Sequence, residues 1–208
     1  MNGERRVIFH TADGLALEGV LHLPGGRAAH GVVVCHPHPL YGGDMNNGVV
    51  LTVCQAALAV GAAALRFNFR GTGGSEGRHE QGEGERLDVA AAVEYLRRLP
   101  EGGARQVAVA GYSFGAAVAL SANIGDLAAL VAVSAPTMAL PSSLPRLPYP
   151  LLLVSGDEDE YSDPDDLTEF AQAAGVELRF VAGADHFWWG HETELREIVA
   201  AFLGRHLG

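Results

Sequence analysis

Apolar residues recur along the chain in short runs that alternate with longer segments of helical periodicity. The short runs, rich in valine, leucine and alanine, occupy residues 31–35, 63–69, 106–110, 128–134, 151–155 and 176–181. The segments with helical spacing occupy residues 48–60, 85–99, 116–123, 165–174 and 192–207. Repeated strand–helix units with continuously apolar strands predict an α/β fold, in which a mostly parallel sheet carries helices on both faces.

The N-terminal segment has a different pattern. Residues 5–10 and 15–23 predict two strands joined at the turn sequence Ala12-Asp13-Gly14, which indicates an antiparallel edge to the sheet. A chain of 208 residues, 48% of them apolar, suffices for one substantial core, and no linker divides it. We therefore expect a single domain over residues 1–208, with a twisted sheet of about eight strands.

Charge and composition narrow the possible partners. The formal net charge is -11 and no stretch is rich in basic residues, which argues against nucleic acid and anionic membrane surfaces as partners. We find no signal-peptide core and no apolar run long enough to span a bilayer, so a cytoplasmic protein is expected. Cys35 and Cys54 lie in apolar segments and are expected as free thiols, a disulfide between them being the less favoured alternative. A homodimer is compatible with the sequence.

The most specific motif is Gly111-Tyr112-Ser113-Phe114-Gly115, which lies between a predicted strand and a predicted helix. A turn this sharp strains the backbone and leaves no room for neighbouring side chains, so glycines flank the serine and its hydroxyl is exposed. The free N–H groups at the start of the helix face any oxyanion that forms beside the serine. Ser113 is therefore the candidate nucleophile, and a purely structural glycine-rich turn is the alternative.

A serine nucleophile needs a base, and the base needs a carboxylate. Acidic residues Asp157 and Asp159 follow the strand at 151–155, and His186 follows the strand at 176–181. Ligands bind beyond the carboxyl ends of parallel strands, so these loops meet Ser113 at the same edge of the sheet. Five of the other histidines are expected to be solvated: His10, His22, His30, His79 and His206. His191, at the start of the last helix, is expected to cap that helix or to lie at the surface.

Five segments together resemble a family of small bacterial α/β-hydrolases of the dienelactone-hydrolase-like type. They are GYSFGA, CHPHPLYGGDMNN, LRFNFRGTGGSEG, LLLVSGDEDE and GADHFWWG, and they cover nearly the whole chain in the expected order. The resemblance implies the α/β-hydrolase fold, a nucleophile at Ser113 and a base at His186. It also favours Asp159 over Asp157 as the acid. Dienelactone hydrolases themselves use a cysteine nucleophile, so their substrate is not carried over.

The same resemblance implies an oxyanion loop at residues 36–43, which supplies one backbone donor while Phe114 N–H supplies the other. Pro37 and Pro39 have no N–H, which leaves His38, Leu40 or Tyr41. By analogy we expect His38 first and Leu40 second. The alternatives are that the prolines only make the loop rigid, or that His36, His38 and Asp44 bind a metal. The latter is disfavoured because no third histidine follows at ligand spacing, and no metal or cofactor is expected.

The remaining candidates concern the walls of the site. The glycine-rich loop 71–84 has no Walker lysine, so a structural loop along the cleft is expected. Arg70, Ser75 and Glu76 are expected to orient it, and the alternative for the charged pair, Arg70 and Glu76, is exposure at the surface. Aromatic residues are candidate substrate contacts, although packing of their loops is the alternative. These candidates are Tyr41, Tyr112, Phe187 and Trp188.

Prolines also bear on the substrate. The segment 135–150 contains Pro136, Pro141, Pro145, Pro148 and Pro150, which forbid a regular helical lid domain. An open cleft favours small, short-acyl carboxylic esters, cleaved by a serine hydrolase without a cofactor. A thioesterase or peptidase with the same triad, and a catalytically inert binding module, are the alternatives.

Overall fold

The computed structural model describes residues 3–25, 28–99, 103–122, 124–140 and 147–207, and these form one eight-stranded sheet. Its order is β1-β2-β4-β3-β5-β6-β7-β8. The strands are β1 (Gly3–His10), β2 (Ala16–Leu23), β3 (His30–Cys35), β4 (Ala63–Phe67), β5 (Gln106–Tyr112), β6 (Leu130–Val133), β7 (Leu151–Gly156) and β8 (Glu177–Val181). The pairs β1–β2 and β2–β4 are antiparallel and all others are parallel, which confirms a mostly parallel sheet with an antiparallel edge.

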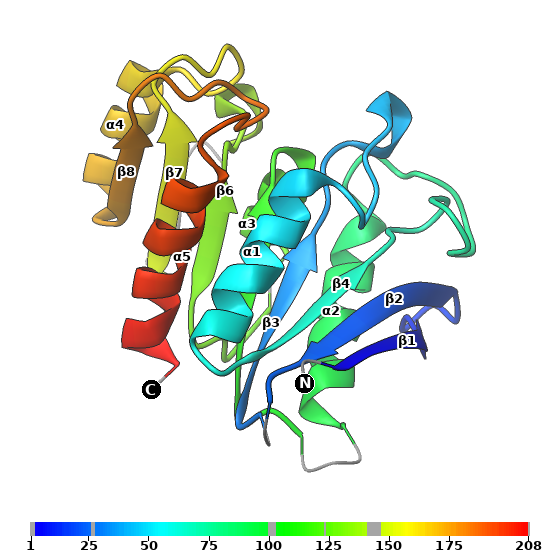
Figure 1. Ribbon diagram of the computed structural model, residues 1–208. Coiled ribbons are helices and arrows are strands. Elements are labelled where there is room, and N and C mark those ends of the chain that lie inside the picture. The colour runs from blue at the N-terminus through cyan, green and yellow to red at the C-terminus, as the bar shows by residue number, and fades with distance from the viewer. Residues whose placement is uncertain (1–2, 26–27, 100–102, 123, 141–146, 208) are drawn as a thin grey trace.

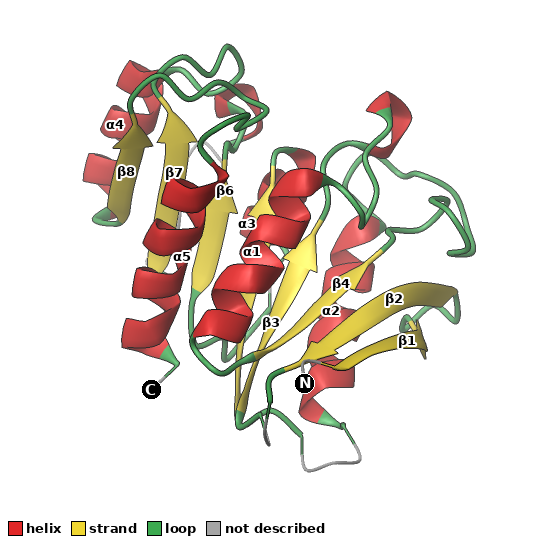
Figure 2. Cartoon of the chain, viewed as in Figure 1, coloured by secondary structure: helices red, strands yellow, loops and turns green. Residues whose placement is uncertain are grey.

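Helices cover both faces of this sheet, as predicted (Figures 1 and 2). The helices α1 (Gly48–Ala59) and α5 (Glu192–His206) pack on one face, and α2 (Glu85–Arg97), α3 (Phe114–Ser121) and α4 (Pro164–Ala174) on the other. Side-chain caps fix two of the starts: Asn47 accepts from Val49 N–H at 2.9 Å, and Asp163 accepts from Asp165 N–H at 3.0 Å. Because strands β3 to β8 run parallel to one another, the loops that follow them all lie at one edge of the sheet.

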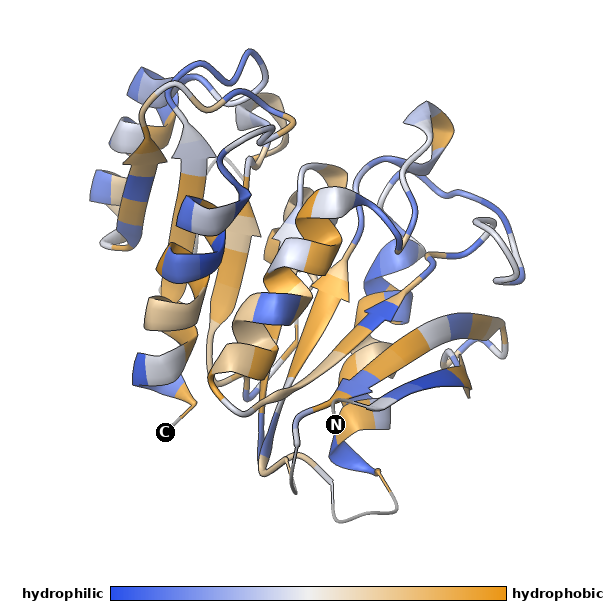
Figure 3. Ribbon diagram, in the orientation of Figure 1, coloured by the Kyte–Doolittle hydropathy of each residue, from blue (hydrophilic) through white to orange (hydrophobic). Residues whose placement is uncertain are grey.

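The core has two layers, one on each side of the sheet. Alternate residues of β3 show this: Val32 and Val34 pack towards α1 and α5, whereas Val33 and Cys35 pack towards α2 and α3. In Figure 3 the central strands are mostly coloured as hydrophobic. Cys35 and Cys54 are both buried and free, and because they lie on opposite faces of the sheet the alternative disulfide is excluded.

Several predicted boundaries shift by a few residues, with consequences near the carboxyl edge. The strand predicted over 63–69 ends at Phe67, because Phe69 N–H donates to the ring of His36 instead of to a strand. The helix predicted from residue 116 begins at Phe114, directly after Ser113. The helix predicted over 85–99 ends at Arg97, and Pro100 lies outside the described residues.

The connection between β6 and β7 is short. Its described residues hold one turn of 3-10 helix, Thr137–Ala139, and Pro141 and Pro145 of the predicted proline-rich segment lie outside them. The described residues of this connection form no lid domain, as predicted. Within the described ranges no helix is long and apolar enough to cross a membrane.

Candidate active site

The turn between β5 and α3 has the strained geometry that its sequence predicts. Ser113 has φ 54° and ψ −117°, a conformation that residues with a side chain rarely adopt. A Cβ atom on Gly115 would lie 2.5 Å from the backbone oxygen of Cys35, and one on Gly111 would collide with the backbone oxygen of Gly115. Only glycine fits at these two positions, so the sequence around Ser113 forces its hydroxyl outward at the start of α3.

The structure brings the three predicted residues of the triad together from three loops. Ser113 Oγ lies 3.1 Å from Nε2 of His186, and Nδ1 of His186 lies 2.9 and 3.0 Å from the two carboxylate oxygens of Asp159. Asp157, the alternative acid, is exposed and accepts from Gly183 N–H at 2.7 Å. Of the two aspartates, only Asp159 contacts the histidine.

Asp159 is held as a carboxylate. Its side chain is buried, and burial alone would raise its pKa, but hydrogen bonds from His186 and Ser134 outweigh burial and hold the pKa below its usual range. Tyr161 N–H donates to its Oδ1 at 3.0 Å, and Ser155 Oγ–H donates to its Oδ2 at 3.3 Å. A charged Asp159 keeps the proton of His186 on Nδ1, so that Nε2 is free to accept the proton of Ser113.

Two of the predicted substrate contacts are wrong, because the structure places them in the interior. Trp188 is 0% exposed, and its Nε1–H donates to Ser134 Oγ at 2.9 Å. Tyr112 is also buried, and its hydroxyl donates to the backbone oxygen of His186 at 2.8 Å, while burial raises its pKa. Both side chains support the triad from beneath, which corresponds to the packing alternative.

The exposed aromatic residues lie around the triad instead. The ring of Phe187 is 5.8 Å from that of His186. The ring of Tyr161, a residue not among the predicted contacts, is 4.6 Å from the ring of His186. Tyr41 is 88% exposed and its ring is 4.9 Å from the ring of His38. Tyr161 comes two residues after Asp159, but no local pattern separates it from a surface tyrosine.

His36 anchors the predicted oxyanion loop to the sheet. Its ring is fully buried, Nε2 accepts from Phe69 N–H at 3.0 Å, and Nδ1–H donates to Pro37 O at 2.6 Å. Burial lowers its pKa to about 4, so the ring is neutral at pH 7. Both nitrogens are engaged within the protein, which leaves no lone pair for the metal-binding alternative.

The same loop distinguishes between the candidate donors. Leu40 N–H donates to Nδ1 of His38 at 3.2 Å, and Tyr41 N–H donates to the backbone oxygen of His38 at 3.1 Å. Within the described residues no hydrogen bond is formed by the N–H of His38 or of Phe114. Their rings are 4.8 Å apart, so the two free N–H groups belong to neighbouring residues. This arrangement favours His38 over Leu40.

The glycine-rich loop is fixed at its base by a buried ion pair. Arg70 is 2% exposed, and its guanidinium donates to Asp88 at 2.8 and 3.0 Å. Ser75 Oγ–H donates to Asn68 O at 2.6 Å, and Glu76 accepts from Ala16 N–H at 2.9 Å. These contacts agree with the orienting role expected for the three residues. The surface alternative is wrong for Arg70, which is buried, whereas Glu76 is exposed as that alternative expected.

His79, which was expected to be solvated, lies in this loop against the oxyanion loop. Its ring is 4.9 Å from that of His38 and 5.3 Å from that of Phe114. Its Nδ1 lies 2.8 Å from a carboxylate oxygen of the fully buried Glu85. This second histidine–carboxylate pair was not predicted, because only the folded loop brings it to the site.

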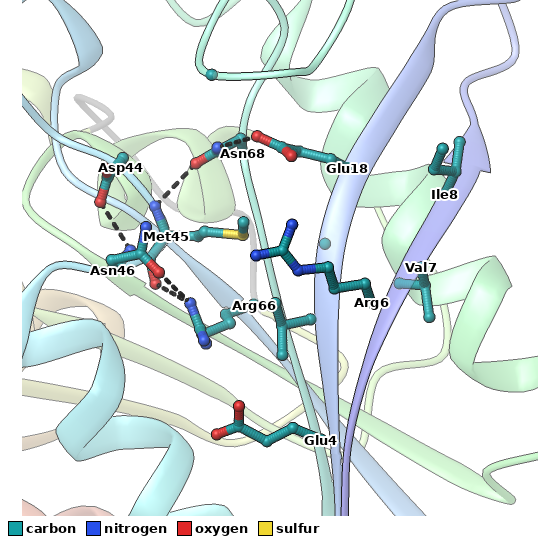
Figure 4. A pocket seen from close by; sticks show the side chains of 13 residues that line it. Glu4, Arg6, Val7, Ile8, Glu18, Asp44, Met45, Asn46, Arg66 and Asn68 are labelled. Atoms are coloured by element: carbon teal, nitrogen blue, oxygen red, sulfur yellow. Dashed lines mark hydrogen bonds between the residues drawn. The ribbon is translucent and has the colours of Figure 1, made fainter.

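A groove of about 790 Å³ lies elsewhere, on the sheet beside β1 and β2 (Figure 4). Its floor holds the buried Arg66, which donates to Nε2 of His22 at 2.9 Å and to Asn46 Oδ1 at 2.6 Å. His22 is thus buried, contrary to the solvated position expected for it. None of the triad residues lines this groove, so the candidate active site is separate from it.

Known proteins resemble the chain over nearly its full length. A family model described as an alpha/beta hydrolase domain matches residues 32–196. An uncharacterised protein of Rickettsia prowazekii is 31% identical over 184 residues, which cover 82% of this chain and 77% of that protein. An alpha-beta serine hydrolase homologue from Coxiella burnetii is 33% identical with a TM-score of 0.86, covering 96% of this chain and 97% of that one. A serine hydrolase without a lid from Xanthomonas campestris is 27% identical with a TM-score of 0.84, covering 97% and 94%.

Proposed function

The chain belongs to the alpha/beta hydrolase family, and we propose that it is a serine esterase that cleaves short-acyl carboxylic esters. The observation that carries the proposal is the continuous contact from Ser113 through His186 to Asp159, at 3.1 and 2.9 Å. A strained serine beside free N–H groups, a histidine with a fixed tautomer and a charged acid are the parts that acyl transfer requires.

In the proposed reaction Ser113 Oγ attacks the ester carbonyl while His186 Nε2 takes the hydroxyl proton. The N–H groups of Phe114 and His38 hold the oxyanion that forms, and Asp159 stabilises the imidazolium. The intermediate collapses, the alcohol leaves with the proton from His186, and the acyl group remains on Ser113. A water molecule, deprotonated by His186, then attacks the acyl-enzyme, and collapse of this second intermediate releases the acid and restores the hydroxyl.

The proposed preference for short acyl groups rests on the open edge of the sheet. The part of the chain that the structure describes forms no lid domain, and the triad lies outside the groove of about 790 Å³. The aromatic rings next to His186, Tyr161 and Phe187, are each 55% exposed, so they offer a long acyl chain little enclosed apolar surface, and chain length beyond a few carbons should add little binding. A thioester or amide could use the same triad, and the leaving group is therefore part of the test.

The test combines labelling and turnover. We expect a fluorophosphonate to label Ser113 stoichiometrically, and Ser113→Ala to lower kcat on p-nitrophenyl acetate by at least about 10⁴-fold. Ser121→Ala is the matched control, because Ser121 is an exposed serine on the same helix whose hydroxyl donates to Val118 O, and it should retain activity. Wild-type turnover by Ser113→Ala would overturn the mechanism. Rates on matched oxygen-ester, thioester and amide substrates then separate the enzymatic alternatives.

A further inference from the structure

We propose that His79 binds a hydroxyl group on the acyl chain of the substrate, so that the preferred substrates are esters of short hydroxy acids. The inference rests on the proposed esterase activity and adds a substrate class to it. It is carried by the position of the imidazole, by the edge of the ring that remains accessible, and by the buried carboxylate behind it.

The imidazole lies beside the proposed oxyanion site. Its ring contacts those of His38 and Phe114, at 4.9 and 5.3 Å, and these are the two residues whose N–H groups are free to hold the carbonyl oxygen. A carbonyl bound there places the first carbons of its acyl chain close to this aromatic cluster. A polar group on those carbons is therefore within reach of His79.

The accessible edge of the ring carries Nε2. The side chain of His79 is 11% exposed, and its Nδ1 is completely buried next to Glu85 Oε1, at a distance of 2.8 Å but out of line with an ideal hydrogen bond. Nδ1 therefore contributes none of this exposure. Within the described residues Nε2 has no hydrogen-bond partner, yet it is not sealed from solvent, so it is available to a ligand.

Packing alone does not explain a histidine at this position. Glu85 already accepts from Glu80 N–H at 2.9 Å and from Gly82 N–H at 2.8 Å, so this buried carboxylate has hydrogen bonds without the imidazole. The contacts of the imidazole with His38 and Phe114 are contacts between rings, which by themselves require no ring nitrogen. What the histidine adds is a second ring nitrogen that is not sealed from solvent, while Nδ1 lies 2.8 Å from a buried carboxylate oxygen.

A hydroxyl group is the ligand that suits this nitrogen. Nε2 accepts a hydrogen bond when the ring is neutral with its proton on Nδ1, and donates one when the ring is charged. A hydroxyl can both donate and accept, so it pairs with either form. An unsubstituted alkyl chain would displace water from Nε2 and leave it unpaired, which costs binding in the transition state.

The experiment compares esters that differ by one oxygen. We measure kcat/KM for ethyl butyrate, ethyl 2-hydroxybutyrate and ethyl 3-hydroxybutyrate, each hydroxy ester as separate enantiomers. The expected result is a preference of about tenfold or more for at least one hydroxy ester over butyrate. In His79→Phe, which keeps an aromatic ring and removes the nitrogen, the ratio of the two kcat/KM values should fall to near one.

The control is another histidine–glutamate pair outside the aromatic cluster. Nδ1 of His191 lies 2.7 Å from a carboxylate oxygen of Glu194, so His191→Phe removes a comparable pair and should keep the wild-type ratio. If His79→Phe does not fold, His79→Leu gives the same comparison. Equal kcat/KM values in the wild type, or an unchanged ratio in the variant, would overturn the inference. If the wild-type protein cleaves none of the three esters, butyrate included, the result would instead reject the esterase function on which the inference rests.

Discussion

At the scale of single residues, the charge of Asp159 depends on a chain of donors that reaches into the core. The indole N–H of Trp188 donates to Ser134 Oγ, and the nearby hydroxyl of Ser134 helps to lower the pKa of Asp159. A serine hydroxyl that already accepts one hydrogen bond has its own proton free to donate, so the indole orients Ser134 towards the carboxylate. A tryptophan expected at the substrate therefore supports the acid from behind.

The two aspartates of the loop after β7 should differ sharply in their effect on activity. Asp159→Asn leaves a neutral amide beside Nδ1 of His186, which removes the stabilisation of the imidazolium and disturbs the tautomer, so kcat should fall by about 10⁴-fold. Asp157→Asn keeps an oxygen for Gly183 N–H and should retain roughly wild-type activity. Steady-state kcat on p-nitrophenyl acetate measures both variants. The opposite ranking would mean that the acid is Asp157.

Residues of the site could be predicted where a motif fixes their backbone, and not where the fold alone places them. Ser113 and His186 follow parallel strands in recognisable loops, so their position at the carboxyl edge of the sheet could be predicted without knowing the order of the strands across it. In Phe187-Trp188-Trp189 the exposed and buried rings cannot be told apart from composition. His79 is located by its neighbours in space, from the loops after β3 and β5, and these are distant in sequence.

At the scale of elements, the oxyanion site is made by two segments that hold each other in place. The backbone of β3 and the first turn of α3 approach so closely that Gly115 has no room for a Cβ next to the oxygens of Cys35 and His36. The loop after β3 is then fixed by the ring of His36. The resemblance implies a donor in this loop but does not identify it. The turn Pro39–Tyr41 does so, because the N–H groups of Leu40 and Tyr41 already donate to His38 and only the N–H of His38 is left.

The backbone donor can be removed without changing the shape of the loop. His38 has φ −60°, which is the angle that proline imposes, so His38→Pro deletes the N–H and keeps the conformation. His38→Ala is the matched variant, because it deletes the imidazole and keeps the N–H. We expect kcat of His38→Pro to lie about 10²-fold below that of His38→Ala. Circular dichroism establishes that both fold, and equal kcat values would assign the donor to another residue.

At the scale of the whole molecule, element types were predictable and their order across the sheet was not. Apolar runs and helical spacing identify the parallel strands and the covering helices, because burial on both faces leaves a direct mark on composition. The position of β3 between β4 and β5 leaves no such mark, yet it places the oxyanion loop directly beside Ser113. The missing lid was foreseen because proline restricts the backbone locally, whatever the tertiary fold.

Buried histidines should make the fold sensitive to mild acid. Burial lowers the pKa of His36 to about 4, and burial followed by the charge of Arg66 lowers that of His22, whereas both should titrate near 6.5 in the unfolded chain. As pH falls below 6.5 the unfolded state binds protons that the folded state does not, so the free energy of unfolding must fall. Asp159 reduces the free energy of unfolding only at still lower pH, because its lowered pKa keeps the carboxylate charged until then.

His36 alone should therefore lower the free energy of unfolding by about 2 kcal/mol between pH 7.5 and pH 5. Urea unfolding at these two pH values, followed by circular dichroism, measures the difference. In His36→Gln the amide oxygen can still accept from Phe69 N–H but does not titrate, so this variant should show a smaller loss than the wild type. Because the variant removes one titrating ring and leaves His22 in place, an identical loss in both proteins would contradict a neutral His36. The acid sensitivity would then belong to the rest of the fold.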